Sequence, residues 1–167
     1  MNWEAVAAVA DWLGVILIIV SLIYVALQIR QNTQMVRAAT ELETGRHWSD
    51  LHARVAHSPD MVDIWDTGLT DPERLTPTEK RRFIWFVAEY FFTVENFYRQ
   101  HKVGFLSVET WSQHEAAVAG LLLHPILQRW WDSGVSPYSQ EFRKAIDERR
   151  KALGDDAVWH YTPIADL

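Results

Sequence analysis

The sequence predicts an all-α protein: one N-terminal transmembrane helix that continues into a stalk, followed by a compact helical-bundle domain. Three observations predict this fold. A long uncharged apolar run lies near the N-terminus, prolines and glycines divide the remainder into helix-length segments, and no run of alternating β-branched residues indicates a strand. The predicted boundaries are 1–30 for the anchor, 31–57 for the stalk, 58–154 for the domain and 155–167 for an irregular tail.

The anchor is predicted from Trp12 to Ile29, where WLGVILIIVSLIYVALQI carries no charge in 18 positions. At about 1.5 Å per residue this helix is about 27 Å long, close to the thickness of a bilayer's hydrocarbon core. A buried core helix of a soluble protein is one alternative. A cleaved signal peptide is another, but its first part should be basic, and here it holds Glu4 and Asp11.

The charges around the anchor predict its orientation. Arg30, Arg37 and Arg46 follow it, and no Lys or Arg precedes Arg30. The positive-inside rule then places the N-terminus outside and the C-terminal domain in the cytoplasm.

One side of the anchor collects small and polar residues. The residues that recur there at spacings of three and four are Asp11, Gly14, Ile18, Ser21, Val25 and Gln28. Small residues let helices approach closely in lipid, and polar residues can hydrogen-bond between helices. We therefore expect a helix–helix interface here, with Asp11 facing headgroups, water or a partner. The alternative is that small residues are simply common in membrane spans.

The stalk continues from the anchor with a single glycine, Gly45, and ends at Ser58-Pro59 because a residue before proline disfavours the helical conformation. A short helix is expected from Pro59 to about Thr67, with Gly68 as its C-terminal stop.

The next helix begins at the capping sequence Thr76-Pro77-Thr78-Glu79 and runs to about Lys102, with Gly104 beyond it. Its centre, FIWFVAEYFFTVENFY (83–98), has eight aromatics in sixteen residues. Because apolar groups lie on nearly all its faces, we expect neighbours to surround it as the central helix. A helix lying on the membrane surface is disfavoured, since such helices usually carry a basic face and this one shows Glu89 and Glu95.

Three shorter helices complete the predicted domain. Ser107 opens the first, Pro125 starts the second, which Gly134 ends, and the last runs from about Ser139 to Leu153, with Gly154 as its stop.

Composition excludes several function classes. The net charge is −6, which disfavours nucleic acid as a partner, and the absence of cysteine excludes thiolate chemistry and disulfides. His47, His52 and His57 are spaced by five residues, about 140° apart on a helix, so they cannot ligate one ion together. No cofactor or metal site is expected, and no catalytic motif is present.

Glu89 and Glu95 are the carboxylates that best suit an enzyme, because burial in the aromatic helix would raise their pKa values and make a general acid. The alternative is that Glu89 meets an arginine of a neighbouring helix. The candidates for this arginine are Arg81, Arg82, Arg99 and Arg129.

Several segments together resemble a broad group of uncharacterised bacterial proteins with one span and a small helical domain. They are SLIYVALQIRQNTQMVRAAT (21–40), ENFYRQHKVG (95–104), the series Trp111, His124-Pro125, Trp130-Trp131, and SPYSQEFRKAID (136–147). The resemblance implies this architecture and the bacterial inner membrane, but no known activity.

These observations predict a non-catalytic assembly or accessory subunit, whose partners are the lipid bilayer and copies of itself or the subunits of a larger complex, such as a bioenergetic one. One alternative is a homo-oligomeric pore lined by Asp11, Ser21 and Gln28. Another is a membrane-tethered enzyme that uses Glu89 or Glu95.

Overall fold

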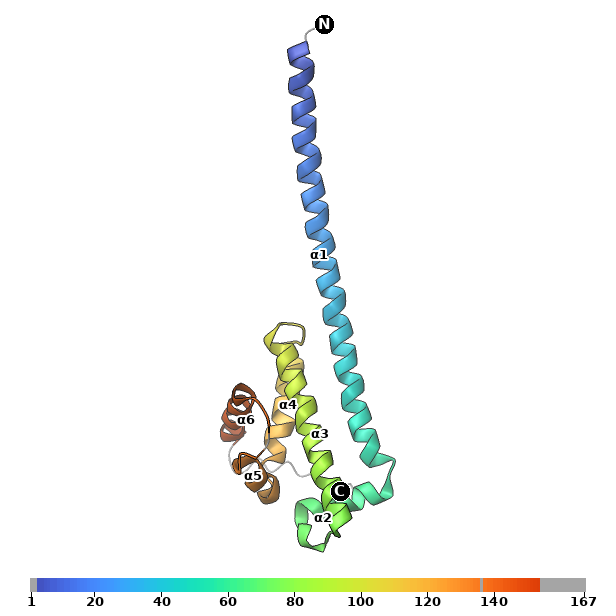
Figure 1. Cartoon of the computed structure of the whole chain (residues 1–167), viewed down its shortest axis with the longest axis vertical. Coiled ribbons are helices and arrows are strands. Elements are labelled where there is room, and N and C mark those ends of the chain that lie inside the picture. Colours follow the sequence, from blue (N-terminus) through green and yellow to red (C-terminus); the bar gives the residue numbers. More distant parts are fainter. Residues whose placement is uncertain (1–2, 136, 154–167) are drawn as a thin grey trace. The chain divides into compact units, whose positions relative to one another are not determined.

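The computed structural model describes residues 3–135 and 137–153, and of residues 5–11 it describes the backbone only. Figure 1 shows the order of its elements. They are α1 (Trp3–Ala56), α2 (Pro59–Thr70), the 3₁₀ turn η1 (Pro72–Arg74), α3 (Pro77–Lys102), α4 (Val108–Leu121), α5 (Pro125–Asp132) and α6 (Gln140–Leu153). No strand occurs among the residues described, which confirms the predicted all-α fold. The predicted stop at Gly154 and the predicted tail lie outside these ranges.

Helix α1 is uninterrupted over 54 residues, which confirms that the apolar segment continues into the stalk as one helix. Contacts divide the chain into two compact units, Met1–Ala39 and Thr40–Leu167. The second unit thus includes the last 17 residues of α1, 40–56, whereas the division expected from the sequence begins the domain at residue 58.

The end of α1 belongs to the second unit because its side chains join that unit's core. Leu51 and Thr44 are buried, and the ring of Trp48 lies 5.1 Å from the ring of Tyr90 on α3. Glu41 adds a polar link to the start of α4, since its carboxylate accepts a hydrogen bond of 2.8 Å from the Ser107 amide. The stalk residues from Thr40 onward therefore serve as a packed element of the domain.

Helix α2 begins at Pro59 as predicted but passes through Gly68 to Thr70, so the predicted stop at Gly68 is wrong. The glycine serves packing instead. A Cβ atom built there would lie 2.4 Å from Cδ2 of Phe83, so only glycine lets α2 approach α3 this closely.

Helix α3 begins at the predicted capping box: Oγ1 of Thr76 accepts from the Glu79 amide, and the Glu79 carboxylate accepts from the Thr76 amide at 2.7 Å. The two glycines predicted to follow helices, Gly104 and Gly134, adopt φ values of 78° and 70°, which glycine accepts without strain.

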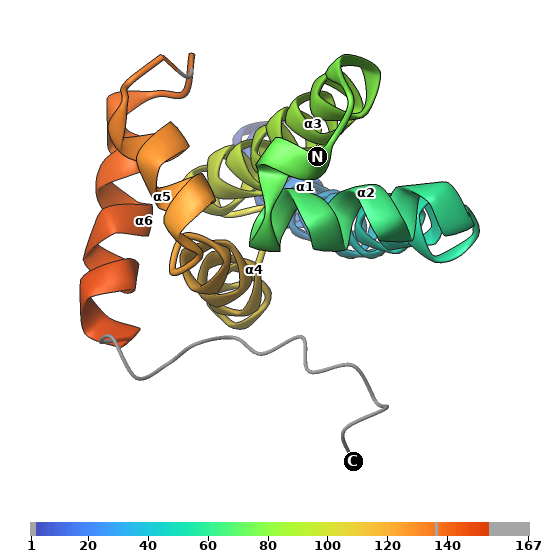
Figure 2. The same cartoon turned by 90° about the horizontal axis from the view of Figure 1, so that it is seen from below.

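The core of the second unit is aromatic. Figure 2 shows α3 and α4 in the middle, with α2 on one side and α5 and α6 on the other. Phe91 of α3 is fully buried, with its ring 5.2 Å from that of Trp131 on α5 and 6.1 Å from that of Tyr138. Phe142 and Ile146 bring α6 into the same cluster. These contacts make α3 the centre of the domain, as its composition predicted.

Candidate functional site

The apolar part of α1 leaves its side chains uncovered. No side chain of its most apolar 18-residue window is buried, and α1 is long and apolar enough near the N-terminus to cross a membrane. Fourteen large apolar residues between Trp12 and Ile29 are exposed, from 48% for Val15 to 70% for Trp12. In a core helix of a soluble protein, other parts of the protein would cover these side chains. Their exposure therefore does not support the core-helix alternative.

The predicted helix–helix interface lies on this segment. A Cβ added at Gly14 would meet nothing within 4 Å, so that side is open to close approach. Ser21 donates to the Leu17 carbonyl at 2.8 Å, and Gln28 Nε2 donates to the Tyr24 hydroxyl at 3.1 Å. The side chain of Asp11 lies outside the described part of the chain. Ile18 and Val25 are exposed, and the interface stays a prediction.

Glu89 pairs with an arginine, but with one that the sequence did not single out. Its Oε1 atom accepts a hydrogen bond from Nη1 of Arg54, near the end of α1. None of the four candidates pairs with it, because the docking of α1 against α3 brings residues 35 positions apart together. The pair is about half exposed, and the Glu89 carboxylate is engaged at the surface.

Glu95 has the buried position that the enzyme alternative required, with only 2% of the residue exposed. Its Oε1 atom accepts hydrogen bonds from the Ser139 amide at 2.9 Å and from Arg99 at 3.1 Å. Burial alone would raise the pKa of Glu95, but these hydrogen bonds outweigh it and lower the pKa below its usual value. The predicted rise is therefore wrong, and the charged carboxylate fixes the chain before α6.

Two histidines come together where α1 meets the domain, on either side of Trp48. The ring of Trp48 lies 4.8 Å from that of His52 and 4.4 Å from that of His114. His114 is buried, and burial lowers its pKa to about 4 although the nearby Glu41 charge opposes the change. Within residues 3–135 and 137–153 no group of three or more histidine, aspartate or glutamate residues is arranged to hold a metal ion.

Sequence reasoning did not identify His114 as a core residue. Its sequence neighbours Gln113 and Glu115 are polar, and only the packing of α1 and α3 against α4 places the rings of Trp48 and Phe97 against it, at 4.4 and 4.8 Å.

The prediction that α3 is surrounded on all sides is wrong for one face. Ile84, Trp85 and Phe92 are exposed, Trp85 by 73%. Helix α3 carries apolar side chains on more of its surface than the neighbouring helices of the described chain cover. The sequence contained the signal, because Trp85 and Phe92 lie roughly opposite the face that holds the buried Phe83, Val87 and Phe91. The number of neighbouring helices, however, cannot be counted from the sequence.

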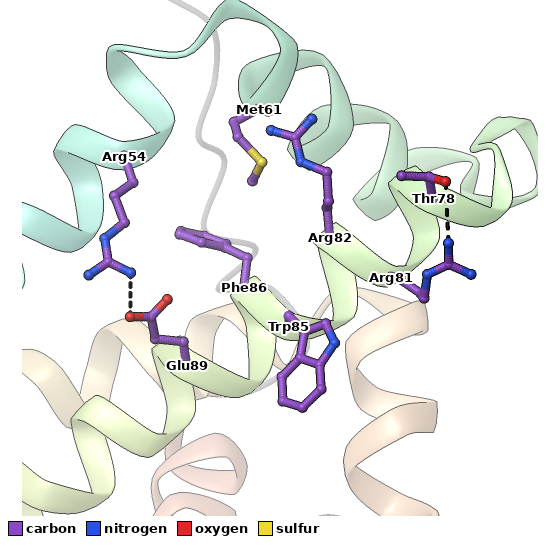
Figure 3. A pocket seen from close by; sticks show the side chains of 8 residues that line it. All are labelled: Arg54, Met61, Thr78, Arg81, Arg82, Trp85, Phe86 and Glu89. Atoms are coloured by element: carbon purple, nitrogen blue, oxygen red, sulfur yellow. Dashed lines mark hydrogen bonds and ion pairs between the residues drawn. The ribbon is translucent and has the colours of Figure 1, made fainter.

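A groove of about 440 Å³ lies beside this face, formed by the end of α1, α2 and the first turns of α3. Figure 3 shows Arg54 reaching Glu89 across it, and Arg81 turned toward the hydroxyl of Thr78. Most of its lining residues are cationic or apolar: Arg54, Met61, Arg81, Arg82, Trp85 and Phe86. A groove of this kind suits a ligand with both negative charge and apolar surface.

No family model, no curated protein and no solved structure matches this chain.

The resemblance to a bacterial group is therefore not supported by a family match. What stands is the architecture itself: a long helix, apolar near the N-terminus, followed by a compact helical domain.

Proposed function

We propose that this protein is a non-catalytic single-span membrane protein that acts as an assembly or accessory subunit of a membrane complex. The observation that carries the proposal is the exposure of the fourteen large apolar side chains between Trp12 and Ile29. Each such side chain gains about 1.5–3 kcal/mol on leaving water, so a chain that keeps them all uncovered needs an apolar medium around them. A lipid bilayer supplies it over the required length.

The proposed location is the bacterial inner membrane, with the N-terminus outside and the domain in the cytoplasm. The arginines that follow the span support this orientation, because Arg30, Arg37 and Arg46 have no basic counterpart before it. Labelling with a membrane-impermeant reagent would test it: we expect a cysteine in place of Asn2 to react from outside, and one in place of Asp63 to react only after permeabilisation.

Assembly through the side that holds Gly14, Ile18, Ser21, Val25 and Gln28 is the second part of the proposal. The open space at Gly14 supports it, since close helix approach in lipid depends on small residues. Copies of the chain, or the subunits of a larger complex such as a bioenergetic one, are the proposed partners.

We favour assembly over the two alternatives for specific reasons. A pore would need polar groups available to water, but Ser21 and Gln28 hydrogen-bond within their own helix. An enzyme would need a free carboxylate, but Glu95 is bound to Ser139 and Arg99, and Glu89 to Arg54.

The size of the detergent-solubilised protein tests the assembly. We expect Gly14→Leu to shift the protein to a smaller particle or to release co-purifying subunits. Ala26→Leu is the matched control, because it also introduces a leucine, about 120° around the helix from Gly14, and should change nothing. A monomer without partners, unaffected by Gly14→Leu, would contradict the proposal.

A further inference from the structure

The groove between α1, α2 and α3 has an excess of positive charge. Three arginines line it, against Glu89 as its one acidic lining residue. Arg54 pairs with Glu89, and Arg82 pairs with Asp60 at 2.7 Å. Among the described residues, Arg81 hydrogen-bonds only the hydroxyl of Thr78, at 3.3 Å, and forms no ion pair with a carboxylate. Its planar guanidinium is therefore available to bind a carboxylate with two parallel hydrogen bonds.

The two existing ion pairs can exchange their partners at little cost. The side chains of Arg54, Glu89, Arg82 and Asp60 are all between 41% and 64% exposed. Exposed pairs of this kind contribute little to stability, because water screens them. A ligand that brings its own carboxylates can thus reach all three arginines without breaking a buried interaction.

The groove also selects for apolar groups in its ligand. Trp85 is exposed on α3 beside Arg81, and Phe86 of α3 and Met61 of α2 add further apolar surface (Figure 3). A small inorganic anion would leave these surfaces uncovered. Tryptophan, methionine and arginine are the residue types enriched where proteins bind other polypeptides, so a peptide that combines acidic and apolar side chains fits best.

We propose that the occupant is this chain's own C-terminal segment, residues 154–167, docked in the groove of the same copy. The segment reads GDDAVWHYTPIADL. It carries Asp155, Asp156 and Asp166 and neither lysine nor arginine, which complements the three arginines. Trp159, Tyr161 and Ile164 supply the apolar groups. The segment lies outside the described residues, and the proposal rests on its sequence and on the groove.

The length of the segment permits this docking. Fourteen residues span at most about 50 Å when extended. A compact domain of roughly 110 residues has a radius of gyration of about 13 Å, so a tail that starts at Leu153 can reach any part of its surface. Because the tail is tethered, its effective concentration at the groove is high, and a weak site is enough to hold it. The proposal does not depend on the membrane anchor.

Site-specific photo-crosslinking of the full-length protein in detergent tests the proposal. The photoreactive amino acid p-benzoylphenylalanine replaces Trp85 in one variant and Met61 in a second, and mass spectrometry identifies the crosslinked peptide. We expect both positions to crosslink to residues 155–167 of the same copy. Val108 provides the control position, because it is exposed on α4 outside the groove and should not crosslink to the tail.

Exchanging charges between the groove and the tail distinguishes specific docking from chance contact. Arg81→Glu should reduce the crosslink from position 85 several-fold, and adding Asp155→Arg with Asp156→Arg should restore it. Arg74→Glu is the matched control, since Arg74 is exposed on η1 outside the groove. Circular dichroism verifies that each variant is folded, and Arg81→Gln replaces Arg81→Glu if the latter is not.

Three results would overturn the proposal. The first is a crosslink from position 85 that remains equally strong after Arg81→Glu. The second is a tail crosslink from position 108 as strong as that from position 85. The third is crosslinking only between differently tagged copies mixed before irradiation, which would assign the groove to a second copy.

Discussion

Two apolar segments of this chain, Trp12–Ile29 of α1 and 83–98 of α3, have similar sequences in one respect: apolar side chains lie on nearly every face. Their environments differ. Along the first, the large apolar side chains are all exposed, whereas along the second Phe91 and Val94 are completely covered by neighbouring helices. The composition of a segment therefore determines how much apolar surface must leave water, whereas the neighbouring elements determine what covers that surface.

The polar groups of the two segments differ in the same way. Ser21 and Gln28 of α1 each donate a hydrogen bond to an atom four residues earlier in their own helix, so each has a partner without a neighbouring helix. Glu95 of α3 needs the Ser139 amide from a distant part of the chain. The α1 segment is thus suited to a medium that offers no hydrogen bonds, and the α3 segment to a folded protein interior.

The largest difference is expected between Phe91→Ala and Leu17→Ala. Phe91 is enclosed by rings of α5 and the loop before α6, so its loss should destabilise the domain by about 3–5 kcal/mol. Leu17→Ala should leave the unfolding of the domain unchanged. Denaturant titration in detergent, followed by tryptophan fluorescence, measures both. Equal effects would mean that the apolar segment Trp12–Ile29 contributes to the domain core as α3 does.

Substitutions at two glycines test the packing of α1 and α2. Gly68→Ala places a methyl group against the Phe83 ring and should cost about 1–3 kcal/mol of domain stability. Gly45→Ala on α1 meets nothing within 4 Å and should add up to about 1 kcal/mol through helix propensity. The same denaturant titration measures whether each substitution lowers or raises the stability of the domain. A neutral Gly68→Ala would show that α2 and α3 are not tightly packed.

The stability of the domain that packs against the end of α1 should decrease in acid because of His114. Burial lowers its pKa to about 4, so between pH 6.5 and about 4 the unfolded chain binds a proton that the folded chain does not. Stability should therefore fall as pH decreases through this range, and the change due to His114 should end below about pH 4. Thermal unfolding at a series of pH values measures this change in stability. His114→Phe is the comparison variant, because it keeps an aromatic ring at the position but cannot titrate. An identical pH profile for both proteins would exclude His114 as the cause.

The smallest effect is expected at the surface link between α1 and α3. Arg54→Ala removes the ion pair with Glu89, which is exposed, and should cost about 0–1 kcal/mol. The loss should shrink further at high salt, because ions screen exposed charges. Denaturant titrations at low and high salt measure it. A larger, salt-independent loss would indicate that the arginine stem packs in the groove.

Local sequence signals predicted much of this fold. The capping box at Thr76, the prolines at positions 59, 77 and 125, and the glycines at 104 and 134 define helix ends through interactions within a few residues. The failures all depend on distant residues. Gly68 is read locally as a stop, but the ring of Phe83 gives it a packing role inside α2.

The candidate sites show the same limit. Arg54 was not among the arginines considered for Glu89, because only the packing of α1 against α3 brings the two residues together. The rise expected for the Glu95 pKa ignored the Ser139 amide, 44 positions away. The groove was not predicted at all, since it is assembled from three helices. The interface on α1 depends on a partner, and no pattern within one chain can supply that partner.

Membrane fractionation of the full-length protein tests whether Trp12–Ile29 spans a bilayer. We expect the chain to stay in the membrane pellet after alkaline washing and to enter solution only with detergent. Val20→Asp, which places a charge in the middle of the apolar segment, should weaken this retention. A folded, monodisperse protein in the detergent-free supernatant would contradict this expectation.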